Sequence, residues 1–139
     1  MILQEKDYTA IYKLSIGMDV YSIYGNVLSR LNKQPYLVVV DEFLAAFKYF
    51  YKTKKLRIYS AIKFGEEAIR IDSNKFALGY WEDDPEIIVS TIRKWMIEQN
   101  VDWNEVWSYQ FYLGFPEIIW FKENGEVFDM FEGMDTNPK

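Results

Sequence analysis

The sequence predicts one α+β domain, in which about five helices pack with short antiparallel strands and a C-terminal β-hairpin. Three observations support this fold class. Apolar residues recur at helical spacing near the N-terminus, two acidic helix-start signals follow in the second half, and Asn124-Gly125 separates two apolar runs. With 139 residues, half of them apolar, the chain can bury one core. Because we find no repeat or linker, we expect a single domain over 1–139, with a frayed polar tail at 133–139.

The N-terminal part predicts three helices. The first is expected over residues 8–16 and ends before Gly17. The second is expected over 19–31, because apolar residues at 20, 23, 24, 27, 28 and 31 would line one helix face. Residues 36–51 favour a third helix with an apolar stripe at 37, 40, 44, 47 and 51, although the run 37–40 alone would suit a strand.

Two later helices are predicted from their first residues. Asp83-Asp84-Pro85-Glu86 has an acidic cap, a proline in the first turn and a glutamate three residues after the cap. This pattern opens a helix that should extend to about residue 99. The same cap-and-glutamate spacing at 102–105 opens a shorter helix that ends near Gly114, a natural C-cap.

The strands are predicted from alternation and turn residues. Residues 56–62 alternate as a half-buried strand does, and 67–71 and 76–80 are shorter candidates. The runs 117–123 and 126–131 flank Asn124-Gly125, the strongest two-residue hairpin signal. A two-residue loop there would place Phe121 opposite Phe128 and Trp120 opposite Asp129.

The composition argues against an enzyme. The chain has no cysteine and no histidine, so it lacks thiolate nucleophiles, the commonest general base and the commonest transition-metal ligand. The acids at 82–86 are explained by helix capping rather than by metal binding, and no glycine-rich phosphate loop is present. An enzyme that uses carboxylates alone remains an alternative. We expect no catalytic residue, no cofactor and no metal.

Neither a membrane nor nucleic acid is expected as a partner. The longest apolar run, 36–40, is far too short to cross a bilayer, and the N-terminus has no signal-peptide pattern, so we expect a cytoplasmic protein. The basic run 52–57 follows three aromatic residues that could stack on bases, which keeps an RNA-binding module open as an alternative. A solvated helix end explains this run better, because the chain has a net charge of −5.

The charges are separated along the chain. Residues 1–63 carry ten Lys and Arg against five Asp and Glu, whereas residues 64–139 carry six against sixteen. Tryptophans are interleaved with the acids. Acidic side chains accelerate the encounter with a basic partner, and buried aromatic anchors hold the complex. The candidate partner-binding residues are Glu82, Asp83, Glu98, Trp103, Trp107, Trp120, Glu123, Glu126 and Asp129.

Several segments together resemble a family of small uncharacterised bacterial proteins. These segments are residues 8–31 with the break at 14–18, the helix at 83–95, and the run 114–120 followed by the Asn124-Gly125 turn. Members of this family are often encoded beside polymorphic or contact-dependent toxins. The resemblance implies an immunity protein, which would bind a cognate toxin and cover its active site or substrate groove. Charge and resemblance together suggest a basic nuclease as the toxin. The alternative is a non-enzymatic regulatory module of phage or plasmid type that binds another protein.

Overall fold

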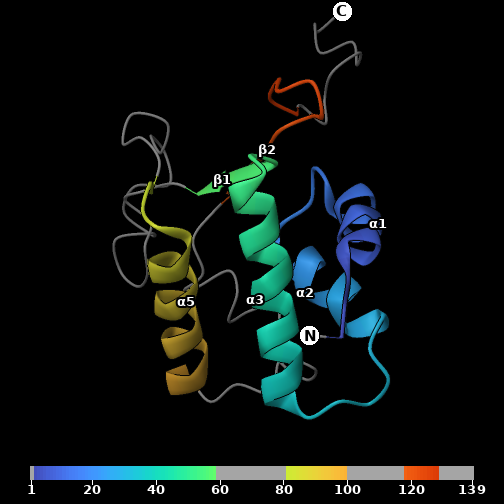
Figure 1. Ribbon diagram of the computed structural model, residues 1–139, viewed down its shortest axis with the longest axis vertical. Coiled ribbons are helices and arrows are strands. Elements are labelled where there is room, and N and C mark those ends of the chain that lie inside the picture. Colours follow the sequence, from blue (N-terminus) through green and yellow to red (C-terminus); the bar gives the residue numbers. More distant parts are fainter. Residues whose placement is uncertain (1, 59–80, 100–117, 129–139) are drawn as a thin grey trace, which may run out of the picture.

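The computed structural model describes residues 2–58, 81–99 and 118–128. Within these ranges the elements are α1 (Glu5–Ser15), α2 (Val20–Ser29), α3 (Tyr36–Lys52), β1 (Leu56–Ile58), α5 (Pro85–Gln99) and β2 (Ile118–Trp120). Figure 1 shows α3 in the centre, with α5 on one side, α1 and α2 on the other, and the small sheet at its C-terminal end. The α+β class is confirmed. The helix expected at 102–114, the strands expected at 67–71 and 76–80, and the tail lie outside the described residues.

The first two helices begin at side-chain caps. Helix α1 starts at Glu5, three residues earlier than predicted, because the backbone N–H of Gln4 donates to Oδ2 of Asp7 at 2.8 Å. Helix α2 follows Asp19, whose Oδ1 accepts from the backbone N–H of Ser22 at 3.1 Å. Both caps satisfy backbone groups that have no partner within the helix.

Helix α5 is capped one residue later than the pattern suggested. Oδ1 of Asp84 accepts from the backbone N–H of Glu86 at 2.8 Å, whereas Oδ1 of Asp83 accepts from the N–H of Asp84 at 3.0 Å. Pro85 then occupies the first helical position, where its missing N–H is not needed. The predicted helix is therefore confirmed, with Asp84 as its cap.

The core forms around α3, which is covered on two sides. Val40, Phe43, Phe47 and Phe50 are fully buried, whereas Leu37, expected on the inner stripe, is 49% exposed. The buried face is broader than the predicted stripe because both α2 and α5 pack on this helix. The inward face predicted for α2 is confirmed by buried Ile23, Tyr24 and Val27. Helix α5 likewise buries one face at helical spacing, with Ile88, Ile92 and Met96.

Strand β2 pairs with β1, from a distant part of the chain. The two strands are antiparallel, with Leu56 opposite Trp120 and Ile58 opposite Ile118. The backbone N–H of Phe121 continues the pairing by donating to the carbonyl of Lys55 at 2.9 Å. This sheet joins the end of α3 to the segment that leads into the last turn.

The register predicted for the hairpin is wrong by one residue. Phe121 forms a bridge with Val127 rather than with Phe128. The backbone N–H of Phe128 donates instead to the carbonyl of Trp120 at 2.9 Å. The hairpin strand expected at 126–131 is described only to residue 128, so Asp129 lies outside the described residues.

Turn geometry explains this shift. Of the two residues in the expected loop, Gly125 has a φ of +88°, but Asn124 does not have a positive φ. A two-residue type I′ loop would need positive φ at both. The backbone N–H of Gly125 closes a four-residue turn by donating to the carbonyl of Lys122 at 2.9 Å, and the N–H of Lys122 donates to the carbonyl of Glu126 at 2.7 Å. Gly125 is thus an added residue in the loop, as in a three-residue hairpin with a bulge.

Candidate functional site

Three of the acids predicted to bind a partner already face cations of this chain. Glu82 comes from the segment before α5, Glu98 from α5 and Glu126 from the last turn. Their ion pairs are Arg57–Glu82 at 3.0 Å, Lys94–Glu98 at 3.9 Å and Lys122–Glu126 at 4.0 Å. Exposed pairs of this kind contribute about 0–1 kcal/mol each to stability. They weaken the field that these acids present to a partner.

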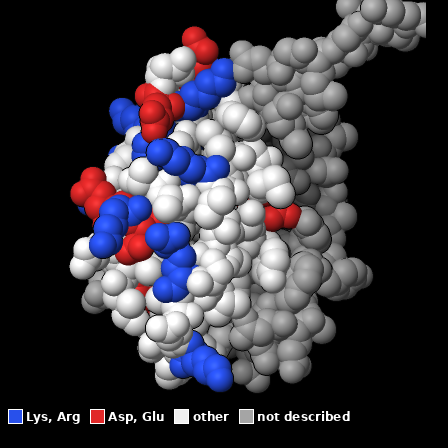
Figure 2. Space-filling view, turned by 90° about the vertical axis from the view of Figure 1, so that its right-hand side faces the viewer, with Lys and Arg blue, Asp and Glu red and all other residues white. Residues whose placement is uncertain are grey.

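The charge separation in the sequence does not persist on the described surface. Cations from the first half of the chain pair with acids from the second half in Lys48–Glu86 and Arg57–Glu82. In the pair Arg93–Asp41, at 2.7 Å, the cation comes from the second half and the acid from the first. Figure 2 shows one face on which basic and acidic side chains lie next to one another. The fold therefore brings the two halves together as complementary surfaces within one molecule.

Trp120 is a core residue, which corrects its assignment to a partner-binding surface. Its side chain is 3% exposed, and its ring centroid lies 5.8 Å from that of Tyr12 and 6.0 Å from that of Phe50. The indole Nε1 donates to the carbonyl of Met18 at 2.8 Å. The pairing of β2 with β1 turns this ring inward. Trp103 and Trp107 lie outside the described residues.

Glu123 differs from the three paired acids. It is exposed on the last turn and has no ion partner among residues 2–58, 81–99 and 118–128. It lines a shallow hollow of about 440 Å³ with Tyr12, Ile16, Lys122, Asn124 and Phe128. Two residues near the lining in the sequence are exposed: Met18, which follows Ile16 by two positions, at 55%, and Val127, next to Phe128, at 47%. We call Met18, Glu123, Val127 and the hollow the turn surface.

Tyr12 connects the turn surface to the core. Its hydroxyl donates to the carbonyl of Phe121 at 2.5 Å. Burial raises the pKa of the Tyr12 phenol, and the negative charge of Glu123 raises this pKa further. Nζ of Lys55 lies 4.8 Å from the Tyr12 ring centroid. The negative charge of Glu123 therefore disfavours ionisation of Tyr12, a residue that lines the hollow.

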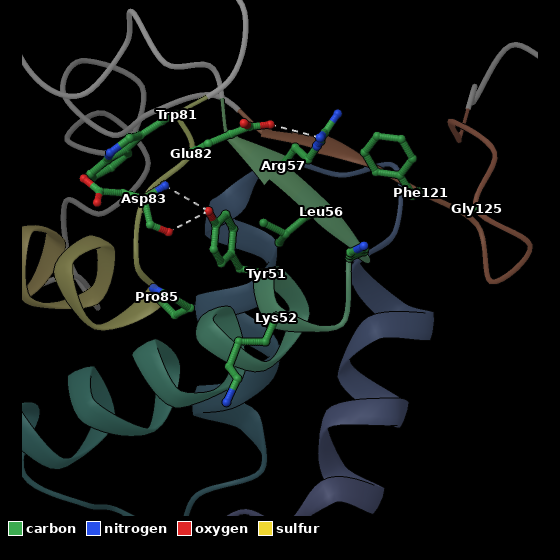
Figure 3. A pocket seen from close by; sticks show the side chains of 11 residues that line it. Tyr51, Lys52, Leu56, Arg57, Trp81, Glu82, Asp83, Pro85, Phe121 and Gly125 are labelled. Atoms are coloured by element: carbon green, nitrogen blue, oxygen red, sulfur yellow. Dashed lines mark hydrogen bonds and ion pairs between the residues drawn. The ribbon is translucent and has the colours of Figure 1, made fainter.

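A larger pocket of about 580 Å³ lies at the C-terminal end of α3 (Figure 3). Leu56, Trp81 and Phe121 contribute apolar wall, and Lys52, Lys54, Arg57, Glu82 and Asp83 contribute charge. The Tyr51 hydroxyl donates to the carbonyl of Asp83 at 2.9 Å, and the N–H of Asp83 donates to this hydroxyl at 3.2 Å. We call this the α3-end pocket.

The sequence did not reveal this pocket. Its two signals, the basic run at 52–57 and the sequence Trp81-Glu82-Asp83, were each visible but lie some 25 residues apart. The first was explained as a solvated helix end and the second as a helix start. Only the packing of the segment before α5 on the end of α3 places them around one cavity.

Within the described ranges, no group of three or more Asp, Glu, His or Cys could hold a metal ion. No helix in those ranges is long and apolar enough to cross a membrane. Comparisons of the chain with protein-family models, with curated proteins and with solved structures found no match.

Proposed function

We propose that this chain is a non-enzymatic protein-binding module, an immunity protein that neutralises a cognate toxin with a basic contact surface. The observation that carries the proposal is Glu123, an exposed acid without an ion partner in the described part of the chain, at the rim of an aromatic-lined hollow. Met18 and Val127, close to its lining residues in the sequence, add exposed apolar area. A central hollow with apolar neighbours and a charged rim is the usual arrangement of a protein contact surface.

The turn surface is held in place by the fold, which favours binding. The Tyr12–Phe121 and Trp120–Met18 hydrogen bonds attach the last turn to the helices, so little ordering is needed when a partner docks. The exposed carboxylate would accelerate encounter with a basic surface, and Met18 and Val127 would slow dissociation.

Co-expression with the toxin encoded by the neighbouring gene tests this proposal. The wild-type chain should restore growth and co-purify with the toxin. Val127→Asp should weaken binding by about tenfold or more, because it puts a charge in an apolar contact, and Glu123→Gln by about fivefold. The matched control is Glu98→Gln, which removes another exposed acid, on α5, and should leave binding unchanged.

The outcomes separate the candidate functions. Binding without restored growth would favour the regulatory module over the immunity protein. Absence of binding, or equal losses for Glu123→Gln and Glu98→Gln, would contradict the turn surface as the contact site.

A further inference from the structure

We propose that the α3-end pocket binds a small aromatic anion, a planar aromatic body that carries one carboxylate or sulfonate. This site does not depend on the proposed toxin partner. The volume of about 580 Å³ is within the range of small-molecule sites, roughly 300–1,000 Å³. The partly exposed Tyr51, Pro85 and Phe121 provide the apolar and aromatic wall that such a body requires, and the buried Leu56 and Trp81 lie behind it.

The charges around the pocket favour an anion. Arg57 and Glu82 neutralise each other at 3.0 Å. Asp83 keeps its negative charge, but Figure 3 shows its carboxylate pointing away from Tyr51 and Arg57, with Oδ1 accepting from the N–H of Asp84. Lys52 and Lys54 have no acidic partner among the described residues. Figure 3 shows the Lys52 side chain pointing away from Tyr51 and Arg57, which leaves Lys54 as the uncompensated cation at the pocket.

Lys54 also occupies a backbone position that lysine disfavours. It follows Thr53, the C-cap of α3, with a φ of +61°. The N–H of Lys54 donates to the carbonyl of Tyr51 at 3.2 Å, and the N–H of Lys55 donates to that of Phe50 at 2.8 Å. This pair of bonds is the Schellman motif, in which the residue with positive φ is usually glycine. A glycine would relieve backbone strain there but would remove this uncompensated cation from the pocket.

The test is a titration of the ¹⁵N-labelled full chain with indole-3-acetate, and with indole-3-acetamide as its neutral isostere. Amide resonances at residues 51–57 and 121 should shift, and the acetate should bind about three- to tenfold more tightly than the acetamide. Lys54→Gly should abolish this preference and also raise the melting temperature by about 2–4 °C.

Two further variants give the proposal its controls. Lys33 is the other non-glycine residue with a positive φ in the described part of the chain, at +28°, and it is not among the residues that line the pocket. Lys33→Gly should therefore leave the preference for the acetate intact. Glu82→Gln should strengthen acetate binding about threefold, because it removes a negative charge that lines the pocket. This gain cannot result from a loss of folding.

Three results would overturn the proposal. The first is no shift at residues 51–57 and 121, as expected if part of this chain fills the pocket. The second is equal affinity for the acetate and the acetamide. The third is a loss of preference in Lys33→Gly as large as that in Lys54→Gly.

Discussion

The ring of Phe128 lies directly against the backbone of Gly17, so that a Cβ at Gly17 would stand 2.4 Å from Cε1 of the ring. Gly17 has a φ of +84° and forms the turn between α1 and α2. This contact presses the last turn of the described chain onto the N-terminal helices. It uses both properties of glycine, the permitted positive φ and the missing side chain.

Gly17→Ala should destabilise the protein by about 2–4 kcal/mol, because it combines a strained φ with a clash against an aromatic ring. Urea denaturation at neutral pH measures this change. Gly125 also has a positive φ, +88°, but its Cβ would meet nothing within 4 Å. Gly125→Ala should therefore lose only about 1 kcal/mol, from backbone strain.

Gly25→Ala is a control for which we expect the opposite change in stability. It lies within α2, and a Cβ there would meet nothing within 4 Å. Gly25→Ala should stabilise the protein by about 0.5–1 kcal/mol, because glycine is unfavourable inside a helix. Equal effects at Gly17 and Gly125 would show that Phe128 does not restrict the Gly17 site.

Glu42 is a buried acid that holds the N-terminal segment on α3. Its side chain accepts from the backbone N–H of Ile2 at 2.5 Å and from that of Leu3 at 3.1 Å, and the residue is 3% exposed. Glu42→Gln should destabilise the protein by about 2 kcal/mol, because an amide nitrogen would face one of these donors. Thermal or urea unfolding measures this loss of stability.

The neighbouring Asp41 is the matched control for Glu42. It is exposed and forms an ion pair with Arg93 at 2.7 Å. Asp41→Asn should change the stability by no more than about 1 kcal/mol. A loss at Asp41 as large as that at Glu42 would contradict the role given to the buried carboxylate.

Asp7 should make stability depend on acid pH. The backbone N–H of Gln4, and then the guanidinium of Arg30, hold the pKa of this carboxyl below its ordinary value of 3.8. The unfolded chain therefore binds the proton more readily. The stabilisation is fully present above pH 3.8 and is lost as the pH falls through the folded pKa.

The difference in melting temperature between the wild type and Asp7→Asn measures this effect. It should be largest near neutral pH and should shrink in acid. Arg30→Met should raise the carboxyl pKa, measured by ¹³C NMR, but leave it below 3.8, because the Gln4 hydrogen bond is the larger cause. A difference that is constant with pH would contradict the capping role of Asp7.

Features encoded within a few neighbouring residues were predictable. The inward faces of α2 and α5 follow from apolar spacing, and the helix start near Asp84-Pro85 follows from capping chemistry. The hairpin register was not predictable. Asn124-Gly125 suits a two-residue loop, but only the backbone conformation of Asn124 decides whether that loop forms.

The candidate site was predicted only at Glu123 and its turn. The burial of Trp120 depends on the pairing of β2 with β1, which joins residues 60 to 64 positions apart. The two ion pairs that neutralise Glu82 and Glu98 also differ in how far apart their partners lie in the sequence. The Lys94–Glu98 pair follows from helical spacing, whereas Arg57–Glu82 exists only because two distant segments meet.

By itself, the sequence determined the α+β class, the helices within the described part and the buried faces of α2 and α5, because local hydrogen bonding and apolar periodicity act over a few residues. Only the tertiary structure decided which charges are compensated and which aromatic rings are buried. It also placed Lys54 and Trp81 around one pocket. These properties depend on contacts between segments that are far apart in the chain. Packing brings such segments together, and no spacing in the sequence reports their distance.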